Sequence, residues 1–347
     1  MVEKNRMKVP FSERKWYEDY DLWLKEKFAA WKPADFKPMI FSGQLLSVES
    51  LSQQADDDLY LEMLFELDLD AIDIYIWPGL YQKNRERYDH IVRRVKENQK
   101  KLIIGYQILP KTHSFAKATF QFEPIFKEPP SFKKFLETEK LYTKEYISRY
   151  KPDYYFVAVE PATNEGRIGS KFTINQWKQL VEEVSRLVKE ICPQTKTGAA
   201  IIHGEERFID YFVEVPYLDI LGFDFYNKDA LGSLELVIKK SQNNEKRVWI
   251  AETWSSLQNI HFNEPWRQDI DARWLKAVIY LAQQHNIEGI NAWWTTHFID
   301  YILMKDQQDY VRKFFNSLQN KRRTATFYAY REVIQEVKRS IRNISKK

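Results

Sequence analysis

Apolar runs with the composition of buried β-strands recur along this chain, and a helical pattern separates each run from the next. Helical periodicity is clearest at 266–285 and behind Thr173, which forms a capping box with Gln176. Strands that alternate strictly with helices form parallel sheets, and eight such units close on themselves. The sequence therefore predicts an α/β fold, a single (β/α)8 TIM barrel. We expect its strands at 39–46, 71–77, 101–106, 154–159, 197–202, 218–227, 247–254 and 287–294.

A doubly wound open sheet is the structural alternative. That fold would carry a glycine-rich turn after its first strand, but the segment FSGQL at 41–45 is not one, and the whole chain has only 10 glycines. Composition does not change markedly anywhere in the chain, so we expect one domain. Residues 1–37 are predicted to form an N-terminal helical extension packed on a barrel domain that spans 38–347. The connection from 107 to about 130 is expected to be irregular.

Charge and apolar content exclude several classes of protein. The net charge is +4 over 347 residues and the two signs are interspersed, which argues against a nucleic-acid partner. No apolar stretch reaches the length of a membrane span, and the single cysteine, Cys192, cannot form an internal disulfide. The first residues lack the apolar core of a signal peptide. We expect a cytoplasmic protein by default, although a sequence from which a signal had been removed would look the same.

Two predicted strands each end on a glutamate. Glu160 follows the run 154–159 and precedes Pro161, which ends the strand because proline cannot donate to a sheet ladder. Glu252 stands in the same position after the run 247–251. Glu-Pro pairs also occur at Glu123 and Glu264, so the buried strand before Glu160 is what distinguishes it. Two carboxyl groups at one end of a barrel are what cleavage of a glycosidic bond requires.

Aromatic and polar residues are expected around these two acids, at the carboxyl ends of other strands. Asp224 and Tyr226 share strand parity and should face the same way, whereas Trp293 and Trp294 are adjacent and cannot both face the interior. Three tryptophans that end or follow different strands should line one cleft, walled by 107–130. Each of these residues can instead be a structural group. The predicted substrate-binding residues are Trp77, Tyr106, His203, Asp224, Tyr226, Trp254, Trp293 and Trp294.

Together these positions resemble clan A of the glycoside hydrolases, over roughly residues 38–340. In that resemblance Glu160 matches the acid/base on strand four and Glu252 the nucleophile on strand seven. Tyr226 matches a strand-six tyrosine that contacts the nucleophile, and Trp293 a strand-eight tryptophan beneath the sugar. The segment 324–331 is similar to the closing helix of many members, and the seventh strand is similar to that of endo-β-1,4-galactanases. The resemblance implies a retaining hydrolase of β-linked glycosides that needs no cofactor or metal.

Two features depart from the clan pattern. Val159 stands where members usually have an asparagine that contacts the sugar 2-hydroxyl, and the second strand offers no arginine to support the nucleophile. A catalytically silent barrel that binds carbohydrate or a protein partner therefore remains an alternative. A metal-dependent hydrolase would use His113, His203 and His297, although their spacing is not that of a metal motif. The separation of the two carboxyl groups distinguishes a hydrolase from a barrel that only binds. The sequence does not predict the oligomeric state.

Overall fold

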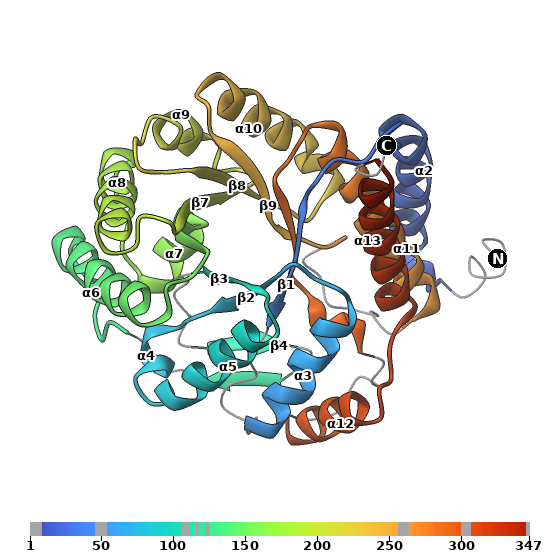
Figure 1. Cartoon of the computed structure of the whole chain (residues 1–347), viewed down its shortest axis with the longest axis horizontal. Helices are drawn as coiled ribbons and strands as arrows, with labels where there is room; N and C mark the ends of the chain where they lie inside the picture. Colours follow the sequence, from blue (N-terminus) through green and yellow to red (C-terminus); the bar gives the residue numbers. More distant parts are fainter. Residues whose placement is uncertain are drawn as a thin grey trace.

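A closed barrel of eight parallel strands forms the centre of the molecule (Figure 1), which confirms the predicted TIM-barrel fold. The computed structural model describes residues 9–45, 54–105, 112–115, 118–121, 125–255, 264–299 and 307–344. Around the barrel the strand order is β1-β10-β9-β8-β7-β6-β3-β2. The barrel strands are β1 (Ile40–Leu45), β2 (Ala71–Tyr75), β3 (Lys101–Gly105), β6 (Tyr154–Val159), β7 (Lys196–Ile202), β8 (Ile220–Phe225), β9 (Arg247–Thr253) and β10 (Gly289–Ala292).

Helices surround the barrel and cover its outer face (Figure 1). The capping box of Thr173 and Gln176 is present at the start of α8. No helix in the described ranges is both long enough and apolar enough to span a bilayer. The α-helices are α2 (Arg14–Trp31), α3 (Gln54–Glu66), α4 (Pro78–Tyr81), α5 (Arg85–Glu97), α6 (Phe132–Tyr150), α7 (Pro161–Ile168), α8 (Ile174–Ile191), α9 (Ile209–Phe212), α10 (Leu231–Asn243), α11 (Pro265–Gln284), α12 (Gln307–Gln319) and α13 (Ala325–Ile344). Short 3-10 turns are η1 (Phe11–Glu13), η2 (Glu206–Phe208), η3 (Lys228–Ala230) and η4 (Thr295–Phe298).

The N-terminal helix α2 packs outside the ring of helices, against α11 (Figure 1). Aromatic rings form this contact: Trp23 stacks on Trp274 with ring centroids 5.6 Å apart, and Trp16 meets Trp266 edge to face. An N-terminal helix on the barrel is therefore present, as the sequence predicts.

Two local expectations differ from the structure. The segment 107–130 was expected to be irregular, but within its described residues β4 (Thr112–Phe115) and β5 (Ala118–Gln121) form an antiparallel pair. The helix expected over 81–99 is divided into α4 and α5. Asn84 lies at the break, and its side-chain amide donates to the carbonyl of Leu80 at 3.0 Å. An asparagine that bonds nearby backbone in this way competes with the helical ladder.

Large aromatic side chains fill the amino-terminal part of the barrel interior. Tyr154 and Trp249 lie with ring centroids 4.8 Å apart, and Phe156 packs in the same buried cluster. Glycine makes room for Trp249, because a Cβ added at Gly289 would lie 2.4 Å from its ring. The barrel interior is thus a packed core, and the polar residues lie at the carboxyl ends of its strands.

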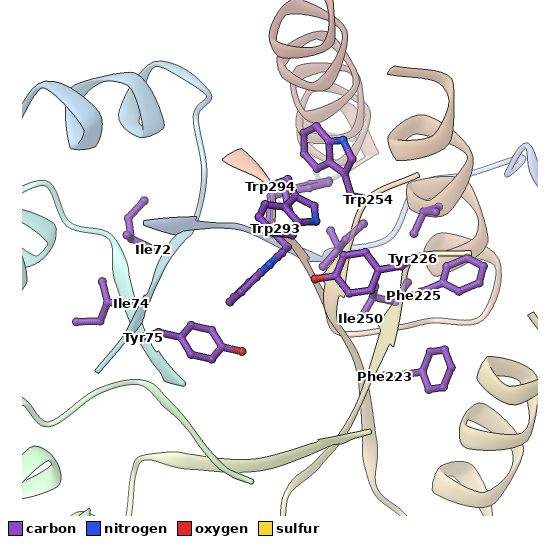
Figure 2. Close-up of a cluster of buried hydrophobic side chains, with 14 of the residues drawn as sticks. Ile72, Ile74, Tyr75, Phe223, Phe225, Tyr226, Ile250, Trp254, Trp293 and Trp294 are labelled. Atoms are coloured by element: carbon purple, nitrogen blue, oxygen red, sulfur yellow. The ribbon is translucent and has the colours of Figure 1, made fainter. Parts of the chain in front are cut away.

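Irregular pairing near the ends of β6 and β9 sets which side chains point inward. In the β8–β9 pair the register shifts by one residue, so that Phe223 pairs with Ile250 but Asp224 pairs with Glu252. Paired residues of parallel strands share a face, so Asp224 and Glu252 both point into the barrel, as does Tyr226 two residues later. Figure 2 shows Phe223 and Phe225 on the opposite side of β8, towards the helices.

Candidate active site

Glu160 lies immediately after β6 in a left-handed backbone conformation, with φ 47° and ψ 72°. For a residue with a side chain this conformation costs on the order of 1–2 kcal/mol, so neighbouring contacts must stabilise it. Asn164 supplies two of them: its side-chain amide donates to the carbonyl of Val159 at 2.6 Å, and its backbone N–H donates to the carbonyl of Glu160 at 3.0 Å. The sharp turn aims Glu160 across the mouth of the barrel. Strain of this kind is typical of functional positions.

Glu205 holds the other side of this turn. One of its carboxylate oxygens accepts from the backbone N–H of Ala162 at 2.6 Å, and the other accepts from Ile202 at 3.2 Å. Burial raises the pKa of Glu205 to about 7, against these two hydrogen bonds. The end of β7 is thereby tied to the first residues of α7, directly behind Glu160.

Two tyrosine hydroxyls hold Glu252. Tyr75 on β2 donates to its Oε1 at 2.6 Å, and Tyr226 after β8 donates to its Oε2. Figure 2 shows the two hydroxyl groups pointing toward one another from opposite sides of the barrel. Burial and the charge of Glu252 raise the pKa of both tyrosines well above the usual value, so both remain protonated donors. Both oxygens of Glu252 are fixed in this way.

Glu160, Asp224 and Glu252 form one buried carboxyl cluster. One oxygen from each lies within 4.8 Å of the others. Burial raises the pKa of all three, and mutual repulsion raises those of Asp224 and Glu252 further. Like charges this close cannot all be ionised, so the cluster titrates as a unit and retains protons near neutral pH.

Arg167 brings positive charge to this cluster. It lies in α7, the helix that begins directly after Glu160. Burial lowers its pKa, while its charge attracts Glu160 and Glu252. Burial raises the pKa of Glu160, and a hydrogen bond with Thr163 and the charge of Arg167 offset part of that rise. The second strand has no arginine, and Arg167 of α7 supplies positive charge near the two glutamates instead.

The structure separates the predicted tryptophans. Trp293 lies against Tyr75, with ring centroids 4.6 Å apart, and so borders the carboxyl cluster. Trp294 stacks instead on His297. The two adjacent tryptophans thus have different neighbours, and we expected that they could not both face the barrel interior. Trp254 has no exposed surface and packs on Phe298, so it offers no face to a sugar. Trp254 lies one residue beyond the end of β9, so the alternation of the strand does not set its direction, and its side chain is placed in the core and not on the expected cleft.

Three further residues were predicted at the site, of which Trp77 and His203 are described. Trp77 is partly buried at the start of α4, two residues beyond the end of β2. His203 is 55% exposed and bonds Ser233 at 2.8 Å and Glu206. Tyr106 lies outside the described residues.

Metal binding has one geometric candidate within the described residues, which is the carboxyl cluster itself. It contains no histidine, and the side chain of His113 is not described. Glu252 already uses both oxygens to accept from tyrosine hydroxyls. A cation ligated by Glu252 would compete with these donors. The surroundings of Glu252 therefore suit a carboxylate that accepts hydrogen bonds more than one that binds a metal ion.

Val159 presents methyl groups where the clan resemblance implies an amide. It is buried among Phe156, Ala200 and Trp249 in the barrel interior. Together with Asp73 and Tyr75 it borders a cavity of about 10 Å³, enough for one water molecule. This position therefore offers a sugar hydroxyl no hydrogen bond.

Sequence reasoning did not find Tyr75, Arg167 or Glu205. Tyr75 was missed because Pro78 placed the expected end of β2 at Trp77, two residues too late. Arg167 was missed because no helix was expected between Glu160 and Thr173, where the structure has α7. Glu205 stands in a loop, where no periodicity indicates direction.

Solved structures with a similar fold support the barrel assignment. An exo-β-1,4-mannosidase, Op5Man5 from Opitutaceae bacterium strain TAV5, matches with a TM-score of 0.62 at 12% identity, covering 89% of this chain and 61% of that one. Fungal β-1,4-galactanases match with a TM-score of 0.56 at 13% identity, covering 81% and 100%. A GH113 β-1,4-mannanase matches with a TM-score of 0.53 at 12% identity, covering 75% and 88%. The likeness is one of fold.

These neighbours agree with the expected resemblance to clan A barrels, to which GH113, GH53 and GH30 enzymes belong. No protein-family model matches the sequence, and no curated protein matches it. What the chain does must therefore be argued from its own residues.

Proposed function

We propose that this protein is a glycoside hydrolase that cleaves β-linked glycosides with retention of configuration. The observation that carries the proposal is the spacing of the carboxyl cluster, in which Glu160 and Glu252 bring oxygens within 4.8 Å of one another. Retaining enzymes place their two carboxyl groups about 5–5.5 Å apart, whereas inverting enzymes need about 6.5–9.5 Å to admit a water molecule. The short separation supports direct attack by one of the two acids.

Glu252 is proposed as the nucleophile. Its carboxylate oxygen forms a bond to the anomeric carbon as the glycosidic C–O bond breaks, and Glu160 gives its proton to the leaving oxygen. In the second step Glu160 takes a proton from water, the water oxygen bonds to the anomeric carbon, and the ester to Glu252 breaks. Each acid thus returns to its starting state.

The surroundings of the two acids support this division of roles. Glu252 accepts two tyrosine hydroxyls, and hydrogen bonds to a carboxylate favour its ionised form. Burial raises the pKa of both acids, that of Glu252 to about 8, so the roles are assigned by the two tyrosine donors that orient Glu252 and by the position of Glu160 at the end of β6. Arg167 balances the single negative charge that the cluster then retains.

The substrate class follows from the proposal only as far as β-linked sugars. Trp293 beside Tyr75 supplies an aromatic wall at the candidate site. The similar solved structures are named for β-1,4-mannan and β-1,4-galactan chemistry, so these two polymers are the first to assay. Recognition of the sugar 2-hydroxyl must come from a residue other than Val159.

Two variants test the mechanism. Glu252→Ala should abolish turnover of every substrate, because no glycosyl-enzyme can form. Glu160→Ala should still react with aryl glycosides that have good leaving groups and then stall. Added azide needs no general base, so it should restore turnover and release a β-glycosyl azide. Glu264→Ala is the matched control, since it changes an exposed Glu-Pro pair at the start of α11.

Full activity in either active-site variant would overturn the assignment of that residue. Release of an α-glycosyl azide would contradict the retaining mechanism. If the wild-type protein binds sugars but cleaves none, the buried Val159 favours the alternative of a silent carbohydrate-binding barrel.

A further inference from the structure

Asp224 is the member of the carboxyl cluster for which the proposed mechanism has no use. Its side chain has 0% exposure. Within the described part of the chain, no N–H or O–H group donates to either of its carboxylate oxygens. A buried carboxylate without donors is costly, because nothing replaces the water it has lost.

The groups that face Asp224 make ionisation harder still. Glu160 approaches from the end of β6, Glu205 from the loop after β7 and Glu252 from β9, and all three are acids that raise its pKa. Tyr226, next on the same face of β8, directs its hydroxyl to Glu252 instead. The nearby cation, Arg167, acts on Glu160 and Glu252.

A proton on Asp224 removes both the cost of a buried charge without donors and the repulsion from the neighbouring acids. It removes the buried charge, and it creates an O–H donor beside carboxyl oxygens that can accept it. Glu252 already accepts two hydroxyls, so Glu160 is the neighbour with room for a further donor. A carboxyl oxygen of Glu160 lies within 4.8 Å of one of Asp224, close enough for a small side-chain rotation to bring the two into hydrogen-bond contact.

We propose that Asp224 is a neutral carboxylic acid that donates its proton in a hydrogen bond to Glu160, as a positioning residue for the acid/base. This inference rests on the proposed glycosidase function for its catalytic meaning. When Glu160 gives its proton to the leaving oxygen it becomes a carboxylate, and the hydrogen bond from Asp224 becomes charge-assisted and stronger. An interaction that strengthens as the reaction proceeds lowers the barrier of that step.

The charge of Asp224 can be tested without any activity. Asp224→Asn replaces a neutral group by a neutral group, so the electrophoretic mobility of the folded protein at pH 7 should not change. Asp229→Asn is the matched control, because Asp229 has 71% side-chain exposure and its replacement should shift the mobility by about one charge. In urea both variants should shift equally, since unfolding ionises Asp224. An equal shift of both variants in the folded state would overturn the proposal.

The bond to Glu160 is tested by the pH dependence of kcat/KM. Its basic limb reports loss of the proton from Glu160. Asp224→Asn retains an N–H donor, so its basic limb should lie within about half a pH unit of that of the wild type. Asp224→Ala removes the donor, so the limb should move up by about one to two units, the worth of one hydrogen bond to a charged group.

The two measurements separate this inference from the proposed function. If the basic limb of Asp224→Asn moves down by more than one unit, an anion has been removed and Asp224 was ionised. A limb that stays unchanged in Asp224→Ala would overturn the bond to Glu160 even in an active enzyme. If no glycoside is cleaved at all, the proposed function fails, while electrophoresis still decides whether Asp224 is neutral.

Discussion

Tyr75 takes the place of the arginine that the clan resemblance implies on the second strand. Its hydroxyl donates to Glu252 at 2.6 Å but adds no charge. Gly105 on the neighbouring strand β3 makes this possible, because a Cβ there would lie 2.9 Å from the tyrosine ring. Positive charge enters instead from Arg167 on α7. Orientation and charge compensation, which one arginine would combine, are therefore divided between two residues.

Tyr75→Phe tests this division at the level of one hydroxyl. Loss of a hydrogen bond to the ionised form raises the pKa of Glu252, so the acidic limb of the kcat/KM profile should move to higher pH. We expect kcat/KM at the optimum to fall about 10- to 100-fold, as a hydrogen bond to a charged group contributes about 1.5–3 kcal/mol.

Tyr155→Phe is the control for that prediction. Its hydroxyl is also buried, but it bonds Thr143 at 3.0 Å on the helix side of β6. It should lower the free energy of unfolding by about 1 kcal/mol and leave the pH profile in place. An acidic limb that does not move in Tyr75→Phe would show that Tyr226 alone sets the ionisation of Glu252.

Single residues could be predicted from the sequence where a strand visibly ends on them. Glu160 and Glu252 follow apolar runs, and Tyr226 shares the parity of Asp224, so their common position followed from the pattern. Which tryptophan faces the site could not be derived, because that depends on how each loop turns after its strand. Trp254 is the case in point, since it follows the shifted pairing of β9 and packs on η4.

At the scale of elements, the alternation of strands and helices was enough to predict the barrel. What it could not reveal was the register shift between β8 and β9, which places Glu252 rather than Ala251 opposite Asp224. A register is a property of two strands together, and neither sequence contains it alone. The β4–β5 pair was missed for a similar reason, because two four-residue strands carry too little pattern.

Gly289→Ala tests how closely the interior of these elements is packed. The added methyl group would lie 2.4 Å from the ring of Trp249, which other barrel residues hold in place. Overpacking of this kind costs about 1–3 kcal/mol, so the midpoint of urea unfolding should fall. Gly232→Ala in α10 adds the same methyl group where no atom lies within 4 Å and should not destabilise the fold. Equal midpoints in both variants would mean that Trp249 is free to move aside.

At the scale of the whole molecule, buried acids at the barrel mouth link folding to pH. Burial raises the pKa of Glu160, Glu205, Asp224 and Glu252 together. An acid whose pKa is higher in the folded state binds its proton more tightly there, so it stabilises the fold at low pH. That contribution is lost as the pH rises through the folded-state pKa. A site built this way makes the protein less stable in alkaline solution.

Glu205→Gln isolates one member of this group. The pKa of Glu205 rises from 4.5 to about 7 on folding, so its contribution is fully present below pH 4.5 and is lost between about pH 4.5 and 7. Relative to wild type, the free energy of unfolding of Glu205→Gln should therefore increase across that range, by up to about 3 kcal/mol. Urea unfolding at a series of pH values measures the difference.

The neighbouring Glu206 provides the control for this last prediction, because its pKa is shifted in the opposite direction. Hydrogen bonds from Ser233 and from the backbone of Gly204 lower it to about 2, against the effect of burial. Its stabilisation is present above pH 4.5 and is lost as the pH falls towards 2. Glu206→Gln should therefore change the slope of the stability profile only below pH 4.5. If Glu205→Gln runs parallel to wild type between pH 4.5 and 7, Glu205 is ionised in the folded protein, and the two backbone N–H groups that it accepts outweigh its burial.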